Sequence, residues 1–131
     1  MTNGQIQRVS PDARTRAQKL GAYGEQLAAR HLVGEGMVVL DRNWRGVGGE
    51  LDLVLRDGDT LVVCEVKTRS STSWGAPLEA VGRRKADRLR RLGAQWMSAH
   101  GVRVPDVRID LVGVLRTADG PVVEHVRAVG A

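Results

Sequence analysis

The chain has 131 residues, a length suited to one domain with a single core. Three lysines and seventeen arginines outnumber fifteen acidic residues, so the net charge is +5 and the pI is near 10.3. Such a charge favours an anionic polymer, such as nucleic acid, as the partner. The alternative is that the arginines only keep the surface solvated. One cysteine excludes an internal disulfide, and the absence of an apolar signal segment or membrane-length apolar run leads us to expect a cytoplasmic protein without membrane contact.

The N-terminal third is predicted to be a tail followed by one long helix. We expect residues 1–10 to be disordered and residues 11–131 to form a single domain. Ser10-Pro11-Asp12 is typical of a helix start, because serine caps the helix, proline fits the first helical position and an acid favours the first turn. The helix should run to about Glu35 and end at Gly36. Its inner stripe is expected to be Ala13, Ala17, Leu20, Gly24, Leu27 or Ala28, and His31 or Leu32.

The rest of the chain is predicted to alternate between strands and one more helix. A strand is expected from Met37 to Trp44, then a loop over 46–49, then a hairpin whose turn lies within residues 56–60. A loop from Ser70 to Pro77 precedes a helix from Leu78 to His100. Two further strands are expected from Val107 to Leu115 and from Val122 to Val129. This order, α-β-β-β-α-β-β, predicts an α/β fold with a mixed central sheet flanked by helices.

The hairpin carries charges in the middle of two apolar strands. Glu50 and Asp52 share one face of the first strand, as Glu65 and Lys67 share one face of the second. If Gly58-Asp59 form the turn centre, Asp52 pairs with Glu65 and Glu50 with Lys67; if Asp57-Gly58 do, Glu50 pairs with Glu65. Either register places carboxylates on one face. A buried carboxylate costs several kcal/mol when unpaired, so a divalent cation is the simplest explanation.

The second helix carries two patterns. Val81, Lys85, Leu89, Leu92 and Trp96 recur at helical spacing on one face, so Lys85 must either reach solvent from the edge of the stripe or find an acceptor at the site. Beside that stripe lie Arg84, Arg88 and Arg91. Such a run is often a solvated face, but next to an anionic site it is better explained by contact with phosphates.

Several other residues have two interpretations. Glu25, between small residues of the first helix, is either a metal ligand or an ordinary exposed glutamate. Asp110 repeats the pattern of a charge inside an apolar strand, and is either a site residue or an arginine partner. Cys64 alternates away from Glu65 and is expected in the core. The three histidines are scattered, without a spacing that suggests zinc.

Taken together, these motifs resemble a known nuclease pattern. A helical Glu25, then Glu50-Leu-Asp52, then Glu65-Val-Lys67 is similar to the signature of the PD-(D/E)XK nuclease superfamily. Gly24-Glu25-Gln-Leu-Ala, Gly49-Glu50-Leu-Asp52-Leu-Val, Glu65-Val-Lys67-Thr-Arg69 and Val-Arg108-Ile-Asp110 resemble the YraN family more closely. That family is largely uncharacterised and is similar to archaeal Holliday-junction resolvases. The resemblance covers about residues 15 to 115. It departs from the superfamily pattern at Leu51, where proline often precedes the metal-binding aspartate.

The resemblance implies a restriction-endonuclease-like fold and a metal-dependent endonuclease acting on nucleic acid, with branched DNA as one substrate and DNA favoured over RNA. Asp52 and Glu65 would bind Mg²⁺ or Mn²⁺ together with Glu25 and the backbone carbonyl of Val66. The catalytic set would be these three acids and Lys67. Glu50, Lys85 and Asp110 would support them from behind, whereas nucleic acid would be held by Arg69, Arg84, Arg88, Arg91 and Trp74. The same resemblance allows a homodimer.

A second hypothesis belongs to another class of protein. The chain could keep the nuclease fold and bind nucleic acid, or assist a partner, without turnover of its own. Every core position of the signature is filled, which argues against a fully decayed site. RNA is a third possibility as substrate, although few aromatic residues are available to stack on bases.

Overall fold

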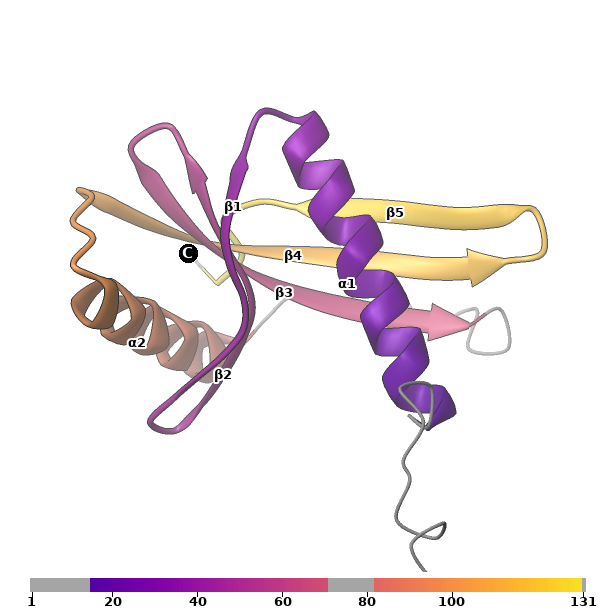
Figure 1. The fold of residues 1–131 in the computed structure, drawn as a ribbon, viewed down its shortest axis with the longest axis horizontal. Coiled ribbons are helices and arrows are strands. Elements are labelled where there is room, and N and C mark those ends of the chain that lie inside the picture. The colour runs from indigo at the N-terminus through magenta and orange to yellow at the C-terminus, as the bar shows by residue number, and fades with distance from the viewer. Residues whose placement is uncertain (1–14, 71–81, 131) are drawn as a thin grey trace, which may run out of the picture.

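A computed structural model describes residues 15–70 and 82–130. Within these residues two helices and five strands occur in the predicted order, and the predicted α/β class with a mixed sheet is confirmed. The elements are α1 (Arg16–Gly34), β1 (Val38–Gly46), β2 (Gly49–Asp57), β3 (Thr60–Ser70), α2 (Arg83–His100), β4 (Asp106–Thr117) and β5 (Gly120–Val126). Figure 1 shows β1 and β2 crossing the long strands β3 and β4 at a steep angle.

The five strands form one sheet in the order β1-β2-β3-β4-β5. The pairs β1–β2, β2–β3 and β4–β5 are antiparallel, and β3 and β4 are parallel. A parallel pair needs a long crossover, and here the connection between β3 and β4 contains α2. The sheet therefore combines hairpins at both edges with one crossover at its centre.

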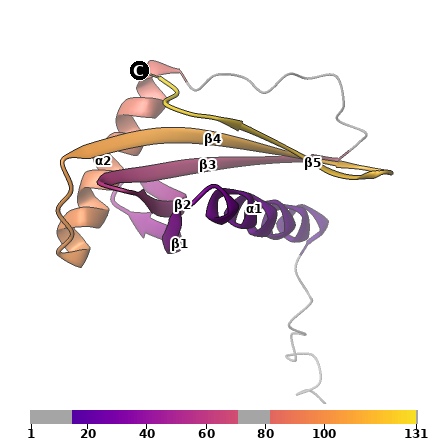
Figure 2. The same cartoon turned by 90° about the horizontal axis from the view of Figure 1, so that it is seen from above.

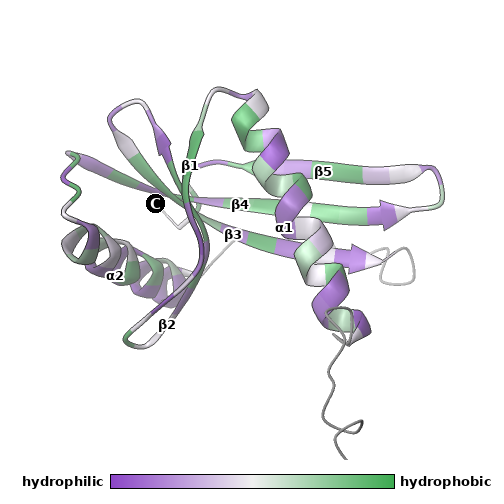
Figure 3. Cartoon of the chain, in the orientation of Figure 1, coloured by the Kyte–Doolittle hydropathy of each residue, from purple (hydrophilic) through white to green (hydrophobic). Residues whose placement is uncertain are grey.

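The helices cover different sides of the sheet, because alternate residues of each strand face opposite ways. Ala28, Ala29 and Leu32 of α1 pack with one set of strand residues, which includes Leu53 and Cys64. The apolar face of α2 packs with the other set, made of Leu51, Val54, Leu61, Val63, Ile109 and Leu111. Figure 2 shows α1 running beside β3 and β4, and α2 at the other end of these strands. In Figure 3 the middle of β3 and β4 is hydrophobic where the helices cover it.

The first helix begins later than the sequence suggested. Thr15 is its N-cap, and the side chains and backbones of Thr15 and Gln18 satisfy each other in a capping box. The prediction that this helix begins at Ser10 is wrong; Ser10 itself and the predicted tail lie outside the described residues. The predicted end is confirmed, since Glu35 is the C-cap. Of the predicted stripe, Gly24, Ala28 and Leu32 are buried, whereas Ala17 is exposed.

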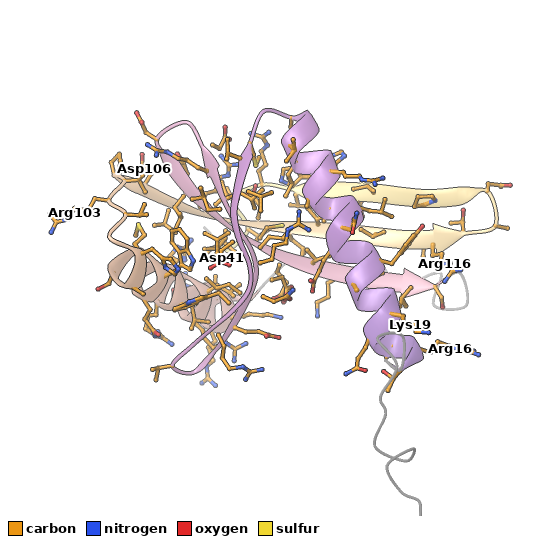
Figure 4. All side chains as sticks on the ribbon, in the orientation of Figure 1. Arg16, Lys19, Asp41, Arg103, Asp106 and Arg116 are labelled. Carbon is orange, nitrogen blue, oxygen red and sulfur yellow. The ribbon has the colours of Figure 1, made fainter. Side chains whose placement is uncertain are left out.

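The other boundaries differ by a few residues. The first strand extends to Gly46, and the second helix begins at Arg83 rather than Leu78, with Gly82 as an N-cap that offers no side chain. The last strand is shifted towards its turn and ends at Val126. Asp41 of β1 accepts a hydrogen bond from the indole of Trp96 at 2.8 Å and so connects β1 to α2 (Figure 4). Across residues 15–70 and 82–130, neither helix has the length and apolar character needed to cross a membrane.

Candidate metal and nucleic-acid site

The hairpin register decides where the central carboxylates point. Asp57 pairs with Thr60, so Gly58-Asp59 form the turn centre, and the ladder continues as far as Leu53 opposite Cys64. The ladder ends there, and its register is the first of the two predicted. Leu53 and Cys64 face the core beneath α1. Beyond the ladder, the carboxylate of Asp52 lies against β3, where the backbone N–H of Val66 donates to it, and Glu65 contacts Lys85 of α2.

Asp52 is the most strongly perturbed carboxylate of this group. It is half-buried, and its Oδ2 accepts a hydrogen bond from the backbone N–H of Val66 at 2.9 Å. Burial raises the pKa of Asp52 to about 6; the Val66 hydrogen bond opposes the rise, whereas the negative charges of Glu65, Glu25 and Glu50 add to it. Four carboxylates from three elements therefore interact at one place, and within residues 15–70 and 82–130 the backbone N–H of Val66 is the one hydrogen-bond donor to Asp52.

Glu25 reaches this place from α1. Burial raises the pKa of Glu25, a hydrogen bond with the side chain of Asn43 opposes the rise, and the charge of Glu50 adds to it. Asn43 lies in β1 with a φ of 50°, a left-handed conformation that asparagine tolerates better than most residues. Gly24 lets the helix approach closely, because a Cβ there would come 2.7 Å from Cγ2 of Thr68 on β3. The alternative of a freely exposed Glu25 does not describe the structure.

Lys85 has a partner at the site, which was one of its two predicted alternatives, whereas Glu50 has a partner that was not predicted. The ammonium group of Lys85, at the start of α2, contacts Oε2 of Glu65. It lies at the site and does not extend into solvent, although one third of its side chain is exposed. Glu50 was interpreted as a residue that supports the site or as the partner of Lys67 or Lys85; in the structure it pairs with Arg45 of the neighbouring strand at 3.7 Å. Glu50 still influences the site through its charge on Asp52 and Glu25.

These carboxylates share a region without forming a compact ligand set. In the part of the chain that the structure describes, the oxygens of Glu25, Asp52 and Glu65 do not all lie within 4.8 Å of one another. Binding one ion through all three would therefore require side-chain rotation, and the ion would compete with Lys85 for Glu65. The chemistry of the donors fits a hard divalent cation, because every side-chain ligand is a carboxylate and Asp52 is ionised only at a cost.

The basic residues of α2 lie on its outer face. Arg84, Arg88 and Arg91 are exposed, and among residues 15–70 and 82–130 no hydrogen bond or ion pair involves them. Their spacing of four and three residues places them on one side of the helix, over about 10 Å of its length. Lys67 is exposed on β3, while Arg69 is half-buried and has interactions of its own. Trp74 lies outside the described residues.

Asp110 belongs to a different cluster. It is fully buried on β4, where Arg108 donates two hydrogen bonds to its carboxylate, at 2.8 and 3.1 Å. His125 and the backbone N–H of Ala128 complete its contacts, at 2.9 and 3.1 Å. The expectation that Asp110 supports the metal site is therefore wrong, and the alternative of an arginine partner is correct. Burial works to raise the pKa of Asp110, but these hydrogen bonds outweigh it and hold the pKa below 3.8.

Three features of the site region were not foreseen from the sequence. Asn43 holds Glu25 from a neighbouring strand, and an asparagine inside a strand was the only local signal for it. A second basic group contains Arg16 and Lys19 of α1 and Arg116 of β4, which lie at the same end of the molecule in Figure 4. The histidines are not all scattered, because two of them meet at one glutamate, as described below.

Comparison with known proteins gives a consistent family assignment. The family model described as "Uncharacterised protein family UPF0102" matches residues 24–114. A UPF0102 protein of Nocardioides sp. (strain ATCC BAA-499 / JS614) is 65% identical over 114 residues, which cover 86% of this chain and 92% of the relative. A UPF0102 protein of Streptomyces coelicolor (strain ATCC BAA-471 / A3(2) / M145) is 59% identical over 113 residues, covering 84% and 87%. The matched region contains every residue of the carboxylate cluster.

Proposed function

We propose that this chain, which belongs to the uncharacterised protein family UPF0102, is a metal-dependent nuclease that hydrolyses phosphodiester bonds in nucleic acid. The observation that carries the proposal is the gathering of Glu25, Glu50 and Glu65 around the half-buried Asp52, whose pKa is raised by burial and by these charges. A fold gains nothing from gathering carboxylates that repel one another, whereas a cation-binding site needs such a gathering. Perturbed acids beside a basic helix face suit a polyanionic substrate.

Mg²⁺ or Mn²⁺ is the proposed cofactor. Asp52 and Glu65 would be its main ligands, with Glu25 and the carbonyl of Val66 as the others, because hard divalent ions prefer oxygen donors. When bound, such an ion supplies a water of lowered pKa and positive charge at the phosphate. The hydrogen bond from Val66 to Asp52 fixes the carboxylate against β3, and Asn43 does the same for Glu25 against β1.

The cationic side chains would bring and hold the phosphate backbone. Lys67, exposed two residues after Glu65, would neutralise charge on the reacting phosphate or orient the attacking water. Arg69 would hold an adjacent phosphate. Arg84, Arg88 and Arg91 would contact phosphates further along the strand, since they already stand in solvent beside the helix end that carries Lys85.

We also propose a fold relationship and a substrate for this chain. The order of elements and the crossover between β3 and β4 suit a restriction-endonuclease-like fold of the PD-(D/E)XK type. A relationship to Holliday-junction resolvases, which we propose from the motifs, would make branched DNA the preferred substrate, and a homodimer would supply two sites for two strands. A protein that acts on chromosomal DNA with Mg²⁺ would work in the cytoplasm.

Cleavage assays with matched variants test this proposal. Labelled junction, flap, single-stranded and duplex substrates are incubated with Mg²⁺ or Mn²⁺. Asp52→Asn and Glu25→Gln should lose metal-dependent cleavage, while Asp59→Asn and Glu124→Gln, which change exposed acids elsewhere, should keep it. Cleavage that survives Asp52→Asn, or that needs no divalent ion, would refute the proposed site. Failure of the wild-type chain to cut any substrate would leave the second function described next.

A binding or accessory protein without turnover is the second candidate. It is favoured by one observation, the contact of Lys85 with Glu65, because a lysine on a metal ligand competes with the metal. Both candidates require phosphate contacts on α2, and binding measured at several salt concentrations tests them. Replacing Arg84 and Arg88 by alanine should flatten the log–log salt slope by about two, whereas replacing Arg30 and Arg103 should not. Equal salt slopes for the two double variants would mean that the α2 arginines are solvated and do not contact phosphates.

A further inference from the structure

A second cluster of potential metal ligands lies away from the acidic site, where the end of α1 meets β5. Nε2 of His31 lies 3.3 Å from Oε2 of Glu35, one helical turn later. The other oxygen of Glu35 lies 3.0 Å from Nδ1 of His125, which comes from β5. Figure 1 shows the end of α1 next to β5. Within residues 15–70 and 82–130, this is the one group of three such side chains whose ligand atoms all lie within 4.8 Å of one another.

The spacing of these atoms matches a small metal site. With metal–ligand bonds of about 2.0–2.1 Å, neighbouring ligands of a tetrahedral ion lie about 3.3–3.4 Å apart. Each histidine nitrogen already lies near that distance from one oxygen of Glu35, His31 at 3.3 Å from Oε2 and His125 at 3.0 Å from Oε1. The two imidazole rings stand at 90° to each other with centroids 6.0 Å apart, so neither ring blocks the other. An ion bound by one oxygen of Glu35 has to draw together three ligand atoms that all lie within 4.8 Å of one another.

The surroundings of His125 resemble the support of a metal-binding histidine. Its Nε2 lies 2.9 Å from Oδ2 of Asp110, a fully buried carboxylate. A carboxylate that accepts the outer N–H of a histidine fixes the ring and leaves its other nitrogen free for a metal. Asp110 is itself held by Arg108 and by the N–H of Ala128, so it cannot turn towards the cluster. The side chain of His125 is only 6% exposed, whereas those of His31 and Glu35 are about one third exposed, which gives an ion access from solvent.

We propose that His31, Glu35 and His125 bind one transition-metal ion of the Zn²⁺ class. Two imidazoles and one carboxylate suit Zn²⁺, Co²⁺ or Ni²⁺ and do not suit Mg²⁺, which prefers oxygen ligands. Arg127 contacts Glu35 at 3.4 Å and also lies 3.6 Å from Asp57. The ion replaces it at Glu35, and Arg127 keeps its second acceptor. Three protein ligands leave a fourth position for water. The bound ion fastens the last strand to α1, so this site stabilises the fold and is independent of the nuclease proposal.

Titration of the full chain with Co²⁺ and with Zn²⁺ tests this site. With excess Mg²⁺ present to occupy the acidic site, the wild type should bind one Co²⁺ or Zn²⁺ per chain, with visible absorption when Co²⁺ binds, and Zn²⁺ should raise its melting temperature. His31→Gln should lower the affinity at least about tenfold, as losses around metal sites do. His31 is the residue to change, because replacing His125 would remove one hydrogen bond from the buried Asp110 and destabilise the fold around β4. Glu35→Gln is a second variant that avoids this problem.

Two controls separate this site from other histidines and from the acidic cluster. His100→Gln changes a histidine that stacks on Trp96, away from the cluster, and should leave the affinity unchanged. Excess Mg²⁺, which prefers the oxygen ligands of the acidic cluster, should leave Co²⁺ binding at the two imidazoles unchanged. The proposal is overturned if the wild type binds neither ion at micromolar concentration. It is equally overturned if His31→Gln and Glu35→Gln both bind like the wild type, or if excess Mg²⁺ abolishes Co²⁺ binding.

Discussion

Asp52→Asn should stabilise the protein at neutral pH, although it removes the centre of the proposed site. A carboxyl group whose pKa rises from 3.8 to about 6 on folding costs about 3 kcal/mol more to ionise in the folded protein than in the unfolded chain. Asparagine carries no charge and can still accept the hydrogen bond from Val66 with its amide oxygen. Burial of the new amide offsets part of the gain, so we expect about 1–2 kcal/mol of added stability at pH 7.5.

The sign of the pH dependence follows from the direction of the shift. The folded pKa lies above the unfolded one, so the folded state binds the proton more tightly and the wild type loses stability as pH rises from about 4 to about 6. Below pH 4 both the aspartic acid and the asparagine are neutral. The advantage of Asp52→Asn should therefore be small at pH 4, grow through this window and stay constant above it.

Urea unfolding at pH 4.0 and pH 7.5 measures this difference, and Asp59→Asn is the matched control. Asp59 lies in the hairpin turn with 87% of its side chain exposed, so Asp59→Asn should show no gain in stability between pH 4 and pH 6. Mg²⁺ at pH 7.5 should reduce the difference in stability between Asp52→Asn and the wild type. The ion stabilises the folded wild type by binding to it, whereas the variant lacks the carboxylate that binds the ion. A variant less stable than the wild type at pH 7.5, or equally shifted at both pH values, would refute the reasoning.

Two further changes test the packing around the sites by thermal and urea unfolding. Gly24→Ala should lower the free energy of unfolding by about 1–3 kcal/mol, because the new Cβ would lie 2.7–2.8 Å from carbons of Thr68. Gly21→Ala, with no atom within 4 Å of its new Cβ, should raise it by up to about 1 kcal/mol. Equal effects of the two variants would mean that α1 does not pack closely on β3. Asp110→Asn should lower the free energy of unfolding by about 3 kcal/mol above pH 4, because it leaves Arg108 partly unpaired. This loss should become smaller as the pH falls through the lowered pKa of Asp110. An unchanged free energy of unfolding would contradict the ion pair between Arg108 and Asp110.

Sequence patterns predicted those features of the fold that depend on residues close together in the chain. Glycine and aspartate between apolar runs predicted a hairpin turn here and left two registers open, of which the structure has the one centred on Gly58-Asp59. The order of elements followed from hydrophobic periodicity. The start of α1 was missed because two capping signals compete. Ser10 with its proline is the more familiar one, but Thr15 and Gln18 form the cap of the observed helix.

Contacts between distant segments were not predictable in the same way. The meeting of His31 and His125 depends on the pairing of β4 with β5, which brings residue 125 opposite Val112 and towards α1. No spacing in the sequence encodes that arrangement. The partner of Lys85 was left open for the same reason, since a helical stripe says which face is buried and not which strand residue lies beneath it. Glu50 found Arg45 because the turn between β1 and β2 brings them opposite each other.

Asp52 and Asp110 show how one sequence pattern leads to two physical outcomes. Each is an aspartate between apolar residues in a strand, and each loses hydration on folding. Asp110 receives hydrogen bonds from a guanidinium, an imidazole and a backbone amide, so its charged form is favoured and its pKa falls. Asp52 receives one backbone amide, and its other neighbours are carboxylates, so its charged form is disfavoured. The fold satisfies the first residue with several donors and leaves the second with a raised pKa, and under our proposal this is the difference between a structural carboxylate and a metal-binding one.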